Sequence, residues 1–212
     1  MDIGAGVGYN TTIFSQVVSP EFKVYAFEPD ESNYVALKEI IERRMLREKI
    51  IVVKAAIGET ERTVRFWHNE KHLGDNRVFT ESFAKYRADL VETHIIPLYS
   101  IDGFAEQKIA HSSIKFIKID VQGYELPVCH GMQKTIKVNP NIVIALEYDP
   151  ANICEMGFQP QALLNFFQGR DFFTYRIHKS GRLQLIQTRE ELDEQISRDK
   201  YINLLFCKER VN

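Results

Sequence analysis

Cysteine is scarce in this sequence, and its cysteines do not cluster. Of the 212 residues only three are cysteines, Cys129, Cys154 and Cys207, and they lie far apart. There is no CxxC pair and no Cys/His cluster, so neither a disulfide framework nor a zinc site is indicated. We expect a reduced, cytoplasmic compartment, which is the default for such cysteine usage. We assign no metal ligands, although a divalent cation is compatible with the chemistry considered below.

Long apolar runs and an excess of one charge are also lacking. No apolar run approaches the roughly 18 residues that a membrane helix needs, so no membrane span is expected. The chain carries 27 basic and 29 acidic residues, for a net charge of −2, and they are interspersed. Without a basic stripe, we expect no nucleic-acid partner. The composition, 44% hydrophobic and 26% charged, is ordinary for a globular protein, and the length suits one domain over residues 1–212.

Strand-like and helix-like segments alternate along the chain, which is typical of an α/β fold. We expect strands at 23–28, 50–57, 62–68, 94–100, 114–120, 141–147, 172–178, 182–187 and 203–207. We expect helices at 11–18, 30–47, 81–91, 126–137, 161–169 and 189–198. The nearly continuous apolar run 50–57 predicts a strand covered on both faces. Lys179-Ser180-Gly181 predicts a hairpin between two antiparallel strands near the C-terminus.

The N-terminal segment is short for the element that it should form. Only Met1–Ile3 stands where a first strand would end, and the chain opens almost directly on a glycine-rich loop. In a parallel sheet such a strand would be central. We therefore expect a truncated first strand, and we expect that a preceding strand or helix of the natural protein is missing.

The glycine-rich loop is the first functional signal. It reads Asp2-Ile3-Gly4-Ala5-Gly6-Val7-Gly8. Glycines at this spacing let the backbone turn tightly and let a ligand approach without a β-carbon in the way. The helix that follows would point free N–H groups toward a carboxylate or phosphate. The loop thus predicts a ligand at the carboxyl end of a parallel sheet.

The spacing of the loop separates two ligand classes. The dinucleotide fingerprint requires G-x-G-x-x-G. Counted from Gly4 the third position is Tyr9, and counted from Gly6 it is Thr11, so neither register fits. Asp2, two residues before the first glycine, would meet a pyrophosphate badly. A carboxylate there suits a ligand with an ammonium group, such as the methionine part of S-adenosylmethionine (SAM).

A second acid supports an adenosine-type ligand. Glu28 ends the second predicted strand, 20 residues after Gly8, and is followed by Pro29. An acid in that place can accept both hydroxyls of a ribose, as in NAD and SAM sites alike. Glu28 therefore indicates the ribose, and the glycine spacing favours SAM over NAD. On its own, either feature also fits a plain glycine turn or a solvated acid at a strand end.

Four separated blocks of the sequence resemble the motifs of the FkbM family of SAM-dependent methyltransferases. Their order and spacing match over nearly the whole chain. The blocks are Asp2-Ile3-Gly4-Ala5-Gly6-Val7-Gly8-Tyr9-Asn10-Thr11, Ala26-Phe27-Glu28-Pro29, Ala55-Ala56-Ile57-Gly58 and Ile117-Lys118-Ile119-Asp120-Val121-Gln122-Gly123-Tyr124-Glu125. The segment Ser100-Ile101-Asp102 is similar to the family's Leu-Asp in altered form.

The resemblance implies a Rossmann-like class I methyltransferase fold: a mostly parallel sheet, helices on both faces and an antiparallel strand pair at the C-terminal end. It implies a SAM-dependent enzyme that methylates a hydroxyl on a sugar, polysaccharide or related natural product. The partner would then be a small-molecule or glycan acceptor. The residues implied to hold SAM are Asp2, Gly4, Ala5 and Gly6 at the methionine end, Asn10 and Thr11 near its carboxylate, Glu28 at the ribose, Pro29 and Ala56 at the adenine, and Asp120 near the reacting methyl group.

Candidates for the catalytic base follow from the chemistry, because a sugar hydroxyl is a poor nucleophile and needs a base or a metal. Asp120 and Glu147 both end predicted strands at the ligand edge, so we name them as the catalytic candidates. Structural roles for them are to orient the SAM amino group or to form a salt bridge. His72 and His94 are weaker candidates, since a lone histidine in a loop or at a strand start is more often solvated or structural.

Two further features bear on this interpretation. Segment 74–77 could be a lid over the acceptor or simply a polar turn. Gln122 stands where the family has Glu, and Lys54 stands where it has a small polar residue. These departures keep open a catalytically inactive SAM- or nucleotide-binding module. An NAD-dependent oxidoreductase is a further alternative, which the glycine spacing disfavours.

Overall fold

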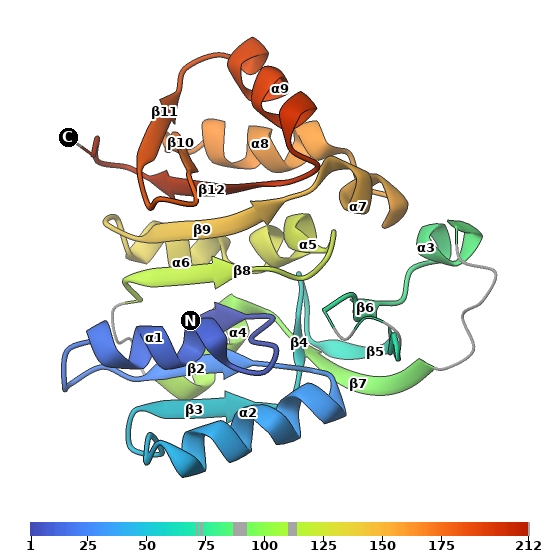
Figure 1. Ribbon diagram of the computed structural model, residues 1–212, viewed down its shortest axis with the longest axis vertical. Coiled ribbons are helices and arrows are strands. Elements are labelled where there is room, and N and C mark those ends of the chain that lie inside the picture. Colours follow the sequence, from blue (N-terminus) through green and yellow to red (C-terminus); the bar gives the residue numbers. More distant parts are fainter. Residues whose placement is uncertain (71, 73, 87–92, 110–113, 212) are drawn as a thin grey trace.

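An eight-stranded sheet forms the centre of the molecule (Figure 1). The computed structural model describes residues 1–70, 72, 74–86, 93–109 and 114–211. The strands, in spatial order, are β11 (Leu183–Ile186), β10 (Phe173–Ile177), β12 (Ile202–Cys207), β9 (Val143–Tyr148), β8 (Phe116–Ile119), β1 (Asp2–Ile3), β2 (Val24–Phe27) and β3 (Ile50–Val53). Strands β9, β8, β1, β2 and β3 are mutually parallel, whereas β12, β10 and β11 are antiparallel. The predicted α/β fold is confirmed. The expected hairpin is formed by β10 and β11, and β12 pairs with β10 at the antiparallel end of the sheet.

Helices cover both faces of this sheet. On one face α1 (Tyr9–Val17) and α2 (Glu31–Arg43) pack on β2 and β3. The opposite face carries α4 (Ile101–Phe104), α5 (Glu125–His130), α6 (Gln133–Val138) and α8 (Pro160–Gln168). Strand β2 shows the division, because alternate side chains of a strand point to opposite faces. Ala26 packs with Leu37 of α2, whereas the ring of Phe27 meets the ring of Phe104 in α4.

Strand β1 is two residues long, as the short N-terminal segment predicts, and it lies in the middle of the sheet. Asp2 is in register with Ala26 of β2 on one side and with Lys118 of β8 on the other. The amino group of Met1 donates a hydrogen bond to the Phe116 carbonyl at 2.7 Å. The glycine loop therefore starts between two longer strands.

A second, four-stranded sheet packs beside the first, and the sequence analysis did not anticipate it. Its order is β4 (Ala56–Ile57), β7 (Thr93–Tyr99), β5 (Arg62–Trp67) and β6 (Arg77–Val78). The single strand predicted over 50–57 is wrong: β3 ends at Val53, and after Lys54 and Ala55 the chain enters the second sheet as β4. Ala55 donates its N–H to the Val53 carbonyl at this bend. Both halves are apolar, so the hydrophobic pattern does not mark the bend; β3 is nevertheless an edge strand with Ile51 exposed, and the expected cover on both faces is wrong for it.

The helices differ from prediction in several places. Helix α4 was not predicted, and α2 ends at Arg43, although the helix was expected to reach residue 47. The helix expected over 126–137 is two helices, α5 and α6, because Asp102 of α4 accepts the N–H groups of Lys134 and Thr135 and caps α6 from another part of the chain. Of the helix expected at 81–91, α3 (Glu81–Tyr86) is described, and residues 87–91 lie outside the described part. Helix α7 (Pro150–Glu155) was not predicted, although Asp149-Pro150 is a helix-start signal. Helix α9 (Arg189–Arg198) is confirmed, and a π-helical turn, η1 (Ala105–Ile109), follows α4.

Candidate functional site

A cavity of about 420 Å³ opens at the carboxyl ends of β1, β2 and β8, beside the second sheet. Parallel sheets commonly bind ligands at this edge. The predicted cofactor residues that line it are Gly4, Ala5, Gly6, Asn10, Glu28, Pro29, Ala56 and Asp120. Residues outside that prediction also contribute, among them Asn33, Phe66, Asn76, Lys118, Gln122 and Tyr124. The chain therefore brings most of the predicted binding residues to one cavity.

The glycine loop passes very close to β8. Gly4 has a φ of +74°, and a β-carbon on it would lie 1.9 Å from the Asp120 carbonyl oxygen. Only glycine fits such a position. The N–H groups of Gly4 and Ala5 both donate to the Phe27 carbonyl of β2. A β-carbon on Gly6 would meet no atom within 4 Å, so the loop faces open space on the cavity side, as ligand approach requires.

Glu28 closes the loop from the end of β2. Its Oε2 accepts the Gly6 N–H at 2.7 Å, and its Oε1 accepts the Asp30 N–H at 2.9 Å. The residue is only 4% exposed. Burial raises the pKa of Glu28 to about 7, and the two backbone hydrogen bonds oppose that rise. Both carboxylate oxygens retain lone pairs for hydroxyl donors at the cavity.

Beneath the loop lies a buried cluster of charges that the sequence analysis only partly found. Asp2 accepts a hydrogen bond from the Thr11 hydroxyl, and neither residue lines the cavity. Lys118 donates to the Gly4 carbonyl at 2.9 Å, and its Nζ lies 3.4 Å from both Asp2 Oδ1 and Asp120 Oδ2. Burial lowers the pKa of Lys118, but attraction to Asp120 and Asp2 outweighs it and the net pKa is raised. Lys118 was missed, although the alternation of its strand places it on the same face as Asp120.

The two catalytic candidates are joined through Gln122. Asp120 lines the cavity, whereas Glu147 at the end of β9 does not. The Gln122 Nε2 donates to Asp120 Oδ1 at 2.9 Å and to Glu147 Oε1 at 3.3 Å. Burial raises the pKa of Glu147 to about 7, reinforced by the charges of Asp120, Glu125 and Asp149. Glu147 can thus take up or release a proton near neutral pH, while Gln122 links it to Asp120 at the cavity.

Segment 74–77 lies at the rim of the cavity. Gly74 and Asn76 line it, while Asp75 and Arg77 bind one another and the side chains behind them. His72 and His94 are exposed and do not line the cavity. The rim therefore carries amide and backbone groups rather than a histidine base.

The described residues hold neither a metal-binding cluster nor a membrane-spanning helix. Among them, no group of three or more His, Cys, Asp or Glu side chains could hold a metal ion. No helix in the described part of the chain has the length and apolar character needed to cross a membrane.

Comparison with solved structures identifies the fold. The chain is similar to methyltransferase FkbM from Methylobacillus flagellatus, with a TM-score of 0.58 and 18% identity, over 97% of this chain and 42% of that one. It is also similar to cofactor-bound Rv0187 from MTB, with a TM-score of 0.51 and 10% identity, over 99% of this chain and 72% of that one. At these identities the likeness concerns the fold. The chain spans less than half the length of the Methylobacillus protein.

Comparison with protein families is more specific. No protein of curated function matches this sequence. The model of the methyltransferase FkbM domain matches residues 2–175, which runs from the start of β1 into β10 and includes the glycine loop, Glu28, Asp120 and Glu147. The resemblance drawn from the four sequence blocks is thereby confirmed. The chain belongs to the FkbM family of SAM-dependent methyltransferases.

Proposed function

We propose that the chain binds SAM in the 420 Å³ cavity and transfers its methyl group to a hydroxyl of a small-molecule or glycan acceptor. The observation that carries the proposal is the meeting of the glycine loop, Glu28 and Asp120 around one opening. Each belongs to a different strand end, so their convergence is a property of the folded chain. Membership of the FkbM family supports the same activity.

The residues divide the cavity into parts that suit the parts of SAM. The loop at Gly4–Gly6 and Asn10 would hold the methionine end, with Asp2 and Thr11 supporting the loop from beneath. Glu28 would accept the ribose hydroxyls, and Pro29 and Ala56 would flank the adenine. When bound, SAM supplies an activated methyl group on a sulfonium.

The chain's own contribution to transfer would be alignment and proton removal. Holding the two reactants in line is worth roughly 7–11 kcal/mol of barrier. Asp120 lines the cavity near where the methyl group would lie, so it can orient the acceptor hydroxyl and take up its proton. Glu147, linked to it by Gln122, has a pKa of about 7, a suitable range for a base that works near neutral pH. Asn76 and Tyr124 would contact the acceptor.

Ligand-dependent thermal stability tests this proposal. SAM and its demethylated product should each raise the melting temperature, because a ligand that binds only the folded state at 100 times Kd adds about 2.7 kcal/mol. NAD⁺ should leave it unchanged. Glu28→Ala should weaken SAM binding, whereas Glu31→Ala, an exposed neighbour in the first turn of α2, should not.

Each alternative has its own outcome. Stabilisation by NAD⁺ alone would indicate a dinucleotide enzyme, and SAM affinity unchanged in Glu28→Ala would remove the ribose assignment. Transfer of a labelled methyl group from SAM to a panel of sugars and glycans then distinguishes an enzyme from an inactive binding module. SAM binding with no transfer to any hydroxyl acceptor would contradict the proposed reaction.

A further inference from the structure

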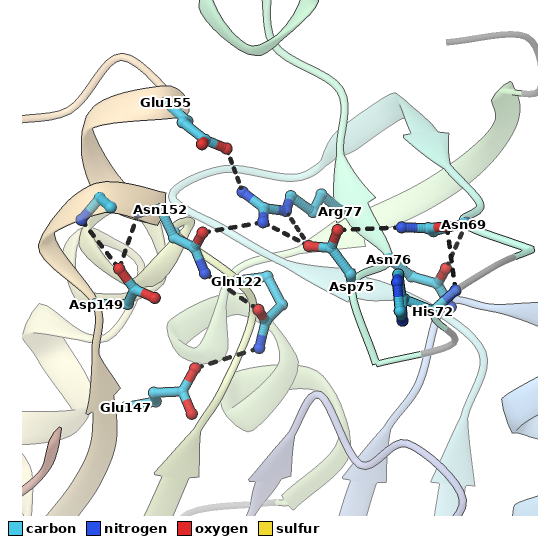
Figure 2. Close-up of polar contacts among 12 residues, drawn as sticks. Asn69, His72, Asp75, Asn76, Arg77, Gln122, Glu147, Asp149, Asn152 and Glu155 are labelled. Carbon is cyan, nitrogen blue, oxygen red and sulfur yellow. Dashed lines mark hydrogen bonds and ion pairs between the residues drawn. The ribbon is translucent and has the colours of Figure 1, made fainter. Parts of the chain in front are cut away.

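A series of polar side chains runs from the rim of the cavity to Glu147 (Figure 2), and Gln122 also connects it to Asp120. The Arg77 guanidinium donates to Asn152 Oδ1 at 3.0 Å, and Asn152 Nδ2 donates to Gln122 Oε1 at 3.2 Å. Gln122 Nε2 then donates to Asp120 and Glu147. These residues come from β6, α7, the turn after β8, and the ends of β8 and β9. Segments far apart in sequence therefore converge on one pair of acids.

The direction of these hydrogen bonds is fixed by Arg77, the first residue of the series. A guanidinium can only donate, so Asn152 must present its carbonyl oxygen to Arg77 and its amide nitrogen to Gln122. Gln122 must then accept with Oε1, which leaves both Nε2 hydrogens for the two carboxylates. The opposite orientation would place Oε1 against two acceptors and Nε2 against a donor.

Arg77 itself is firmly held. It is 4% exposed and donates through Nε and Nη2 to Asp75, and through Nη1 to Glu155 of α7. Asp75 also accepts from Asn69, whose backbone N–H donates to the side chain of Asn76. Because Asn76 lines the cavity, the rim and this series of side chains are one connected structure.

The turn that carries Gln122 is pressed against α7. Gln122 has a φ of +55°, an uncommon value for a residue with a side chain. Gly123 has a φ of +96°, and a β-carbon there would lie 2.4 Å from the Asn152 carbonyl oxygen. Only glycine permits this approach, which brings the Gln122 and Asn152 amides within hydrogen-bond distance.

We propose that Arg77 and Asn152 are positioning residues: they orient the Gln122 amide so that both its hydrogens meet Asp120 and Glu147, and so set the protonation of that pair from the rim of the cavity. The link to catalysis rests on the proposed function, in which the two acids serve methyl transfer. Two donated hydrogen bonds favour the ionised carboxylates. Reversal of the amide would favour their protonation and remove the base.

Several other charges face Glu147, and the test must hold them constant. They are Asp120 at the end of β8, Glu125 on α5 and Asp149 at the start of α7. Lys118 reaches Asp120 from the side of the glycine loop. A variant that reorients Gln122, compared with one that adds the same charge nearby, separates the amide's effect from theirs.

Asn152→Asp makes that change. A carboxylate at 152 still accepts from Arg77 but cannot donate, so Gln122 should turn its Nε2 toward it and its Oε1 toward Glu147. Ala151→Asp adds the same charge at the neighbouring exposed position of α7 and leaves Gln122 untouched. The measurement is the pH midpoint of the Glu147 carboxyl carbon by NMR, assigned by its loss in Glu147→Gln. Asn152→Asp should raise the midpoint by about one pH unit or more, and Ala151→Asp by clearly less.

A neutral variant guards against failure of the first to fold. Asn152→Ala removes the donor without adding charge and should raise the midpoint in the same direction. Equal shifts in Asn152→Asp and Ala151→Asp, or an unchanged midpoint in Asn152→Ala, would overturn the proposal.

The titration needs no ligand, so it can succeed or fail independently of SAM binding. Asn152 does not line the cavity, so Asn152→Ala should still bind SAM, as the unsubstituted chain does. If neither binds SAM, the proposed function fails while the titration still decides the role of Asn152.

Discussion

Glu28 is a buried carboxyl group with a pKa near the pH at which the protein would work. Ribose hydroxyls that donate to it would favour its ionised form, so binding should release a proton below pH 7. SAM affinity should therefore rise with pH, by about tenfold per unit below the pKa, and level off above about 7. Calorimetric titration with SAM at pH values between about 5.5 and 8.5, a window of roughly three pH units around the pKa, measures this dependence.

Glu28→Gln is the matched variant, because the amide keeps the size of the side chain but cannot ionise. It should bind SAM more weakly above pH 7, and its affinity should lose the part of the pH dependence that Glu28 supplies. The same rise in both proteins would assign that dependence to the ligand, whose own amino group titrates, and would contradict the role of Glu28.

Among single residues, the sequence pointed to Glu28 and Gly4 because each has a motif position, but it did not reveal the contacts that Asp2 and Lys118 make. Asp2 is turned beneath the loop, toward Thr11 and Lys118, rather than into the cavity. That arrangement depends on the pairing of β1 with β8, which joins residues more than a hundred positions apart. The spacing of residues along the sequence does not predict a partner from so distant a strand.

Helix α2 joins the two sheets through its N-cap residue, Asp30. Asp30 caps it by accepting the Asn33 N–H, and its other oxygen lies 2.5 Å from His68 Nδ1, beyond the end of β5. Asp30→Ala should lower the free energy of unfolding by about 1–2 kcal/mol, because a buried cap is lost. Asp30→Asn should cost less, since asparagine also caps helices well. Urea denaturation of the variants measures the difference.

Thr188→Ala provides the control for this cap. Thr188 begins α9 with a reciprocal capping arrangement involving Glu191, on an exposed helix outside the cavity. Thr188→Ala should lower the free energy of unfolding by about 1 kcal/mol and leave SAM affinity unchanged. Asp30→Ala should also weaken SAM binding, because loss of the side-chain cap loosens the start of α2, where the backbone N–H of Asp30 holds Glu28. Equal SAM affinities in the two variants would show that α2 does not position the site.

Most elements could be predicted because hydrophobic periodicity and turn residues are local. Helix α9 and hairpin β10–β11 are examples. The second sheet could not, because β4 and β7 pair through backbone groups 42 positions apart, as Ala56↔Leu98. The start of α6 also escaped prediction, since its capping carboxylate comes from Asp102. Both features depend on tertiary contacts.

Among the residues that the structure describes, three carboxyl groups, two buried and one half-buried, have raised pKa values. Burial is the main cause in Glu28, Glu125 and Glu147, each with a pKa of about 7 against 4.5 as the ordinary value. A raised folded-state pKa favours the protonated form, so this stability is complete below about pH 4.5 and is lost as pH rises through about 7. Their contribution makes the fold less stable at pH 8 than at pH 5.

Glu125→Gln should reduce the loss of folding stability between pH 5 and pH 8. The Glu125 Oε1 accepts the Val121 and Gly123 N–H groups, which an amide oxygen can also do, while Oε2 is buried without a hydrogen-bond partner. The difference in unfolding free energy between pH 5 and pH 8 should shrink by up to about 3 kcal/mol. Glu39→Gln, exposed on α2, should leave the difference unchanged. Denaturation at both pH values is the measurement, and similar differences in all three proteins would refute the assignment.

The pairing of β1 also bears on how the molecule folds. Asp2 must pair with Lys118, 116 positions later in the chain, before the glycine loop is flanked by strands on both sides. Contacts of such separation form slowly, because the entropy of closing a long loop is lost before any contact compensates it. At synthesis rates of about 5–20 residues per second, the ribosome would work for several seconds between the two strands. We therefore expect the cavity to be completed late in folding, so that acquired SAM binding reports a finished sheet.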